Sequence, residues 1–237
     1  MRRGGRPNLN LAIYGQGVAH LVRHPSIMVI PLVAAVVDAL VSYWGNLFTD
    51  PLGGLGSGII QMAVQILYLF AFGAAIVQAN NIVRGYRSGF DASWEETRGK
   101  TVGILLAAIG FQFITWAAAY VGGILGGGIV QLALQLVAMF FLIMTIPAAA
   151  IGGLPGQFAL SGSIRAVCAN FPACIVLAIV FVVLWLYVPA IAFNDIGLNF
   201  GIVWGMLATA FARAIILGYL AFPFAVTYDE TAFRGFF

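Results

Sequence analysis

The segment Arg84–Lys100 reads Arg-Gly-Tyr-Arg-Ser-Gly-Phe-Asp-Ala-Ser-Trp-Glu-Glu-Thr-Arg-Gly-Lys and separates two long apolar parts of the chain. It holds seven of the protein's charged residues, which number 11 Lys and Arg and 8 Asp and Glu. Flanking stretches that are long and apolar enter lipid, whereas a segment this polar stays at the membrane surface. The segment therefore predicts a surface connection between two membrane-spanning halves.

The overall composition is that of an integral membrane protein. Of 237 residues, 62% are hydrophobic and 8% are charged, and the mean hydropathy is +1.01, whereas soluble domains carry about 25% charged residues. The net charge of +3 comes from basic residues at the ends of apolar stretches, which indicates membrane topology and no nucleic-acid partner. We find no catalytic or metal-binding motif, so we expect a protein that is not an enzyme and has no cofactor and no metal.

Six stretches are long enough to cross a bilayer, which takes about 20 mostly apolar residues. We expect an all-α polytopic protein with a single membrane domain over residues 1–237. The predicted spans are Ser26–Phe48, Ser57–Val83, Thr101–Gly123, Gly126–Ala150, Ala173–Phe193 and Leu198–Val226.

Basic residues alternate between the two ends of these spans. The connections after the first, third and fifth spans have no Lys or Arg. The other connections and both termini hold all the basic residues except Arg213. Because basic loops stay in the cytoplasm, we expect both termini and Arg84–Lys100 to be cytoplasmic, in a bacterial inner membrane.

The chain also shows internal repetition. Gly58–Gln65 (Gly-Ile-Ile-Gln-Met-Ala-Val-Gln) resembles Gly128–Gln135 (Gly-Ile-Val-Gln-Leu-Ala-Leu-Gln), and Gly201-Ile-Val is a weaker third copy. We expect three parallel hairpin repeats at about 11–83, 84–153 and 154–231, each of which begins with a cytoplasmic amphipathic helix. These helices are predicted at Leu11–His24, Phe90–Arg98 and Gln157–Asn170.

Two charged residues lie inside predicted spans. Asp38 is twelve residues from the start of its span at Ser26, and Arg213 is thirteen residues before Val226. At about 1.5 Å per residue both lie roughly 18 Å deep, where an unpaired charge is costly. We predict an intramembrane Asp38–Arg213 ion pair. It serves as a clamp between the first and last spans or as a polar site for a substrate or a proton; the remaining alternative is that both side chains reach the membrane surface unpaired.

Other polar and small residues recur at helical spacing. Gly197, Gly201 and Gly205 form a stripe that we assign to the sixth span, for packing within the chain or in a dimer. Four glutamines are expected to hydrogen-bond across the bundle or to line a polar cavity: Gln61, Gln65, Gln131 and Gln135. His20 and His24 share a helix face and suggest, more weakly, a metal or haem site.

The layout resembles a known family. Leu21-Val-Arg-His-Pro25 and Ile30-Pro31-Leu32 lead into the first span, and Gly162-Ser163-Ile164-Arg165 precedes Asn170 and the fifth. These segments are similar to those of poorly characterised six-helix bacterial membrane proteins, which are related to the membrane domain of some glycerophosphodiester phosphodiesterases. The resemblance implies a non-enzymatic membrane module. No phosphodiesterase domain is present here, so no catalytic residue is carried over.

From sequence, the favoured function is that of a scaffold or accessory subunit of a membrane complex, with lipid and protein partners. The alternative is a small permease or lipid-handling transporter with its site at Asp38 and Arg213. A third idea, a pigment- or haem-binding subunit, depends on His20 and His24. A transporter needs a polar site that is open to one side, whereas a scaffold needs a filled interior.

Overall fold

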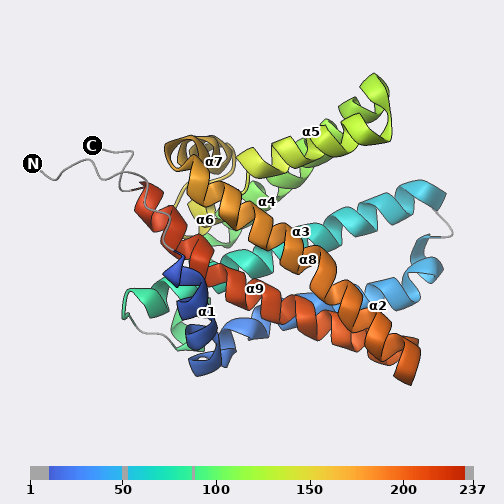
Figure 1. The fold of residues 1–237 in the computed structure, drawn as a ribbon, viewed down its shortest axis with the longest axis horizontal. Helices are drawn as coiled ribbons and strands as arrows, with labels where there is room; N and C mark the ends of the chain where they lie inside the picture. Colours follow the sequence, from blue (N-terminus) through green and yellow to red (C-terminus); the bar gives the residue numbers. More distant parts are fainter. Residues whose placement is uncertain (1–10, 50–52, 87–88, 233–237) are drawn as a thin grey trace, which may run out of the picture.

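The computed structural model describes residues 11–49, 53–86 and 89–232, and within these ranges the ordered elements are all helical (Figure 1). In chain order, the helices are α1 Ala12–Arg23, the short 3-10 helix η1 Pro25–Met28, α2 Val29–Thr49, α3 Gly53–Val83, α4 Phe90–Gly126, α5 Gly128–Phe141, α6 Thr145–Ala150, α7 Gln157–Ala169, α8 Phe171–Phe200 and α9 Ile202–Ala232.

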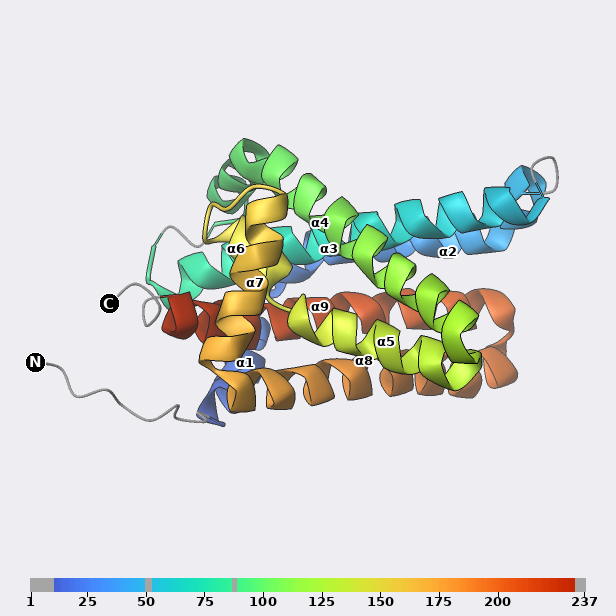
Figure 2. The same ribbon diagram turned by 90° about the horizontal axis from the view of Figure 1, so that it is seen from above.

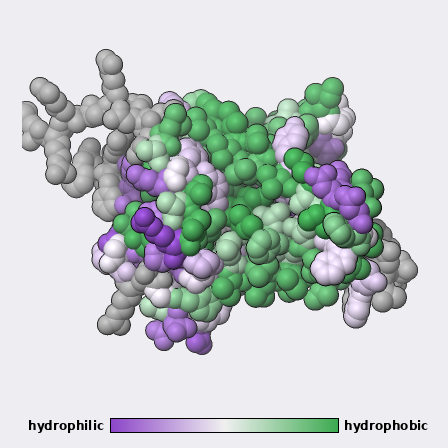
Figure 3. Space-filling view, turned by 60° about the horizontal axis from the view of Figure 1, so that its bottom comes forward, coloured by the Kyte–Doolittle hydropathy of each residue, from purple (hydrophilic) through white to green (hydrophobic). Residues whose placement is uncertain are grey.

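Six helical segments among the described residues are long and apolar enough to cross a membrane, which confirms the multi-pass class. They are Pro25–Trp44, Gly58–Val83, Phe90–Gly126, Gly128–Ala150, Phe171–Phe200 and Ile202–Thr231. Figure 3 shows a broad apolar band across the molecule with hydrophilic side chains gathered on either side of it. This distribution matches a bilayer whose hydrocarbon layer meets apolar side chains and whose surfaces meet polar ones.

The most extensive helix contacts are between α8 and α9, α4 and α5, and α3 and α4, followed by those that α2, α3 and α9 make with one another. Helix α9 also touches α1, α3, α6 and α7 and lies at the centre of the bundle (Figures 1 and 2). The helices form three antiparallel pairs, α2–α3, α4–α5 and α8–α9 (Figure 1). The end of the α4–α5 pair at its turn stands apart from the turn ends of the other two pairs (Figure 1).

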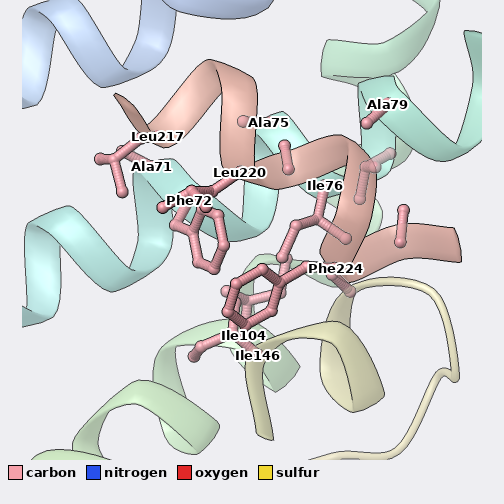
Figure 4. Close-up of a cluster of buried hydrophobic side chains, with 14 of the residues drawn as sticks. Ala71, Phe72, Ala75, Ile76, Ala79, Ile104, Ile146, Leu217, Leu220 and Phe224 are labelled. Atoms are coloured by element: carbon pink, nitrogen blue, oxygen red, sulfur yellow. The ribbon is translucent and has the colours of Figure 1, made fainter. Parts of the chain in front are cut away.

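The apolar core lies where α3, α9, α4 and α6 meet (Figure 4). Phe72 and Phe224 pack edge to face with ring centroids 5.0 Å apart. Ile76, Ile104 and Leu220 are fully buried around them. Because lipid is as apolar as these side chains, their close packing and not their removal from water holds the helices together here, so this junction fixes the frame from which the helices extend.

Two of the three predicted surface helices end in the same backbone conformation. The C-cap of α1 is His24 (φ −128°, ψ 65°), and the C-cap of α7 is Asn170 (φ −140°, ψ 57°). A proline follows within two residues in both cases, Pro25 and Pro172. Pro25 disfavours the helical conformation in His24, the residue directly before it, so the break after α1 follows from sequence. Pro172 stands two residues after Asn170 and is tolerated in the first turn of α8.

The second surface helix is different, and here the prediction was wrong. Phe90–Arg98 is not a separate helix, because α4 runs without interruption from Phe90 to Gly126. No proline interrupts it, and Lys100 pairs with Glu96 one turn earlier at 2.6 Å. The N-cap of α4 is Gly89, and Ser93 lies inside the helix.

The charged segment instead binds its neighbours at one end of the bundle. Asn81 of α3 donates a hydrogen bond to Glu96 Oε2 at 2.8 Å. Lys100 Nζ donates to the Ala150 carbonyl of α6 at 2.8 Å. Arg84, at the end of α3, pairs with Asp229 of α9. The segment that separates the two apolar halves thus joins α3, α4, α6 and α9.

The fourth span was predicted as one helix from Gly126 to Ala150, and the structure breaks it between α5 and α6. Pro147 has no N–H to donate to the carbonyl four residues earlier, which weakens the helix there. Ser163 of α7 fills the break, because its hydroxyl donates to the Phe141 carbonyl at 2.9 Å and accepts from the Met144 N–H at 3.0 Å. This fully buried serine therefore satisfies backbone groups that the break exposes.

Candidate functional site

The structure brings Asp38 and Arg213 together. Arg213 Nη1 of α9 donates to Asp38 Oδ2 of α2, and the two residues form an ion pair. Ser42, one turn further along α2, donates to the other carboxylate oxygen at 3.4 Å. Both carboxylate oxygens of Asp38 therefore accept hydrogen bonds from protein groups.

Tyr68 of α3 is the third member of the cluster. Its hydroxyl donates to Asp38 Oδ2 at 2.9 Å and accepts from Arg213 Nη1 at 3.2 Å. The side chain is buried, with 3% of its surface exposed. A tyrosine hydroxyl can donate and accept at once, so Tyr68 connects the carboxylate and the guanidinium.

Trp185 of α8 closes one side of the cluster. The guanidinium carbon of Arg213 lies 5.6 Å from the ring centroids of both Tyr68 and Trp185. The two rings meet edge to face at 5.4 Å. Aromatic faces attract cations, so the charge of Arg213 is held by a carboxylate and two rings from three helices.

The cluster is only partly covered by protein. The side chain of Arg213 is 30% exposed and that of Asp38 is 16% exposed. The Nε atom of Arg213 is buried without a hydrogen-bond partner. Its Nη2 makes no hydrogen bond within the described residues and is not among the buried unpaired atoms there. Among the guanidinium nitrogens, Nη2 is therefore the accessible one without a partner in the described chain.

Counting residues from the ends of the spans predicted two members of this cluster, Asp38 and Arg213, but did not predict Tyr68 and Trp185. Tyr68 lies fifteen residues before the end of α3 at Val83, and Trp185 lies twelve residues after Ala173. Both are at nearly the same depth as Asp38 and Arg213, since all helices rise about 1.5 Å per residue. A search for hydrogen-bonding aromatics at that level, not for charges alone, is the signal that finds them.

The glutamines do not form the predicted contacts. Gln61, Gln65 and Gln131 are exposed and Gln135 is partly exposed, and none of the four makes a side-chain hydrogen bond in the described part of the chain. The reason is the separation of the α4–α5 pair from α3 at this end of the bundle (Figure 1). The predicted hydrogen bonds across the bundle are therefore absent.

The glycine stripe was assigned to the wrong place. Gly197 lies in α8 and Gly205 in α9, and Gly201 is the turn between them, with φ +99°. A Cβ added at Gly205 would lie 2.9 Å from the Gly197 Cα. The glycines thus allow two helices of one chain to approach closely and do not form a stripe on one helix.

The two histidines lie apart from this cluster, at α1. His20 stacks on Phe222 of α9 with ring centroids 5.3 Å apart, and His24 is the C-cap of α1. No group of three His, Cys, Asp or Glu side chains suited to a metal ion is found over residues 11–49, 53–86 and 89–232.

Comparisons with protein-family models, with curated proteins and with solved structures find no match to this chain.

Proposed function

We propose that this protein is a non-enzymatic, lipid-handling membrane transporter whose binding site is the Asp38–Tyr68–Arg213 cluster. The observation that carries the proposal is the incomplete covering of Arg213, whose side chain is 30% exposed at mid-membrane depth. On insertion scales, a charge at this depth costs about 2.5–3.5 kcal/mol. A guanidinium held there with an accessible, unpaired Nη2 is favourable only if that nitrogen meets a polar group, and a bound ligand supplies one.

The sequence alone favours a scaffold because polar residues in the spans are few. The exposed ion pair changes this preference, since a clamp with no other role is best fully enclosed between α2 and α9. Ser42 and Gln65 are both exposed, one turn from Asp38 and Tyr68 respectively. They extend polar surface from the cluster toward the far ends of α2 and α3, which is the direction from which a ligand would arrive.

The topology that we propose has both termini in the cytoplasm of a bacterium and the protein in its inner membrane. The distribution of Lys and Arg supports it, because the α8–α9 turn and the α4–α5 turn contain neither.

We also propose that three hairpins, α2–α3, α4–α5 and α8–α9, descend from one repeated unit, each preceded by an amphipathic surface segment. The repeated Gly-Ile motifs support this idea, because Gly58, Gly128 and Gly201 all lie near the start of the second helix of a pair. We also propose that the protein is related to the six-helix bacterial proteins that resemble the membrane domain of some glycerophosphodiester phosphodiesterases. The segments around Pro25 and Arg165 support this proposal.

An accessory-subunit function is the second candidate, and α5 is the observation that favours it. None of its fourteen residues is buried. A helix that is uncovered in its own chain offers a face to a helix of another membrane protein. Under this proposal α5 is the partner contact and the ion pair joins α2 to α9.

One experiment separates the two candidates. The protein is purified from its native membrane in mild detergent, and everything that elutes with it is identified by mass spectrometry. If the protein is a transporter, a defined lipid or solute should co-purify with the wild type and be lost from Arg213→Gln. The control variant Arg98→Gln, at the exposed start of α4, should retain it. Protein partners in fixed ratio that survive high salt and remain in Arg213→Gln would instead establish the accessory function.

A further inference from the structure

Gln112 of α4 is an amide side chain that has no partner near the middle of the membrane. It lies twelve residues after Lys100, whose ammonium group binds the Ala150 carbonyl at the charged end of the bundle. At about 1.5 Å per residue, this places Gln112 roughly 18 Å deep in a hydrocarbon layer about 30 Å thick. The side chain is half-buried and makes no hydrogen bond within the described residues, and its amide atoms are not among the buried unpaired atoms there. Because lipid tails offer no hydrogen bond, an accessible amide at this depth is unfavourable.

The surface beside Gln112 is one side of a long helix. Helix α4 has 37 residues without a break, and along it Val102, Ile109 and Trp116 recur every seven residues and are exposed. Leu105 precedes Gln112 by the same interval. Positions that alternate by three and four residues in this way lie along one side of a helix and form the seam where two membrane helices pack. A single polar residue in such a seam fixes the register of the two helices.

We propose that this side of α4 binds α4 of a second copy of the protein, and that the two Gln112 side chains form hydrogen bonds with each other. An amide has two N–H donors and a carbonyl acceptor, so each Gln112 can donate to its counterpart and accept from it. A two-fold axis along the membrane normal brings identical residues together at equal depth. This pairing does not depend on the proposed transport function.

A second copy suits this surface better than a different membrane protein does. A different protein would need a polar residue of its own at the matching depth, whereas a second copy always supplies one. Helix α4 has no Asp, Glu, Lys or Arg between Thr101 and Gly126, so no like charges oppose each other within the membrane. The hydroxyl of Thr115 is satisfied within α4, since it donates to the Phe111 carbonyl at 3.0 Å. The unpaired amide of Gln112 is therefore the group that selects the partner.

Association is measured in liposomes by energy transfer between copies that carry donor and acceptor dyes on C-terminal tags, while the protein is diluted with lipid. For the wild type, we expect transfer that has the stoichiometry of a dimer and that falls on dilution. Gln112→Leu should weaken association at least about tenfold, which corresponds to about 1.4 kcal/mol, because leucine cannot form the hydrogen bonds. Gln112→Asn keeps an amide and should weaken association less.

Two controls accompany these variants. Gln131→Leu removes an exposed amide of the same kind from α5 and should leave association unchanged. Gln112→Leu breaks no side-chain hydrogen bond within the described chain, so we expect it to fold, and circular dichroism should show unchanged helix content.

Cysteine cross-linking in isolated membranes tests which side of α4 is used. The background protein carries Cys168→Ser and Cys174→Ala, so that the added cysteine is the only one. Ile109→Cys lies on the proposed side, and Ile114→Cys lies on another side of the same helix at similar exposure, 39% against 44% for Ile109. We expect a membrane-permeant oxidant to join copies with Ile109→Cys into a disulfide-linked dimer and to leave copies with Ile114→Cys monomeric.

Four results would overturn the inference: no energy transfer at any dilution, the stoichiometry of a larger assembly, association of Gln112→Leu as tight as that of the wild type, or equal cross-linking of Ile109→Cys and Ile114→Cys. If Ile109→Cys instead cross-links to a different protein, the second copy is the wrong partner and the accessory-subunit function gains support.

Discussion

The energetic coupling between Asp38 and Arg213 is the sharpest prediction of the structure. Asp38→Asn and Arg213→Gln each leave an unpaired charge beside Tyr68, whereas the double variant leaves none. Unit charges about 4 Å apart attract by about 4 kcal/mol at an effective dielectric constant of about 20. Partial exposure of both side chains, 16% and 30%, reduces this value. We expect a coupling of about 3 kcal/mol.

In numbers, we expect each single variant to lower the free energy of unfolding by about 2.5 kcal/mol and the double variant by about 2 kcal/mol. Unfolding is measured by titration with SDS in mixed micelles, followed by circular dichroism. The charge-swapped variant Asp38→Arg with Arg213→Asp provides a second test and should recover part of the loss. Single effects that simply add in the double variant, or singles as stable as wild type, would refute the pairing argument.

Three further variants test the packing. Gly122→Ala should lower the free energy of unfolding by about 1–3 kcal/mol in the same assay, because its Cβ would lie 2.5 Å from backbone in α5. The control Gly123→Ala meets nothing closer than 3.5 Å and should be neutral. Equal effects of the two variants would contradict the observed hairpin. Gly205→Ala should destabilise the α8–α9 contact, with a loss of thermal stability as the readout; unchanged stability would show that the helices can separate freely. Ser163→Ala removes two hydrogen bonds at the helix break and should lower the free energy of unfolding by about 2 kcal/mol. The exposed control Ser161→Ala should have a negligible effect, and a neutral Ser163→Ala would mean that water replaces the hydroxyl.

The membrane class and the helix positions could be predicted because lipid imposes a simple rule on length and polarity. The breaks could be predicted only where proline directly follows a surface helix, as at Pro25. The break before Pro147 was missed, since the serine that fills it comes from α7, sixteen residues later in the chain. Hydropathy does not report such a partner.

The turn at Gly201 was missed for a related reason. Asn194, Asp195 and Asn199 interrupt the apolar pattern and suggest a loop, yet α8 continues as far as Phe200. Polar residues at the end of a long helix are stable where the helix leaves the hydrocarbon, so their position marks the membrane surface and not the end of the helix. The positive φ of Gly201 is the actual turn signal.

The unequal burial of the helices explains how Arg213 is accommodated. Similar hydropathy does not imply similar burial, because an apolar side chain suits lipid and protein equally: the spans Pro25–Trp44 and Gly58–Val83 have the same mean hydropathy of 2.0, yet 22% of the first and 44% of the second is buried. In α9 the buried share reaches 67%, against 22% in the α5–α6 span. Small residues carry the missing information, since they let backbones approach. Ala210, Ala214 and Gly218 place α9 among its neighbours on both sides of Arg213. A charge on this central helix can reach a carboxylate and two aromatic rings from three other helices at once, and the same charge on α5 would meet lipid on most sides. The position of the arginine on α9 is therefore what allows a mid-membrane cation to be largely satisfied and yet keep its Nη2 accessible.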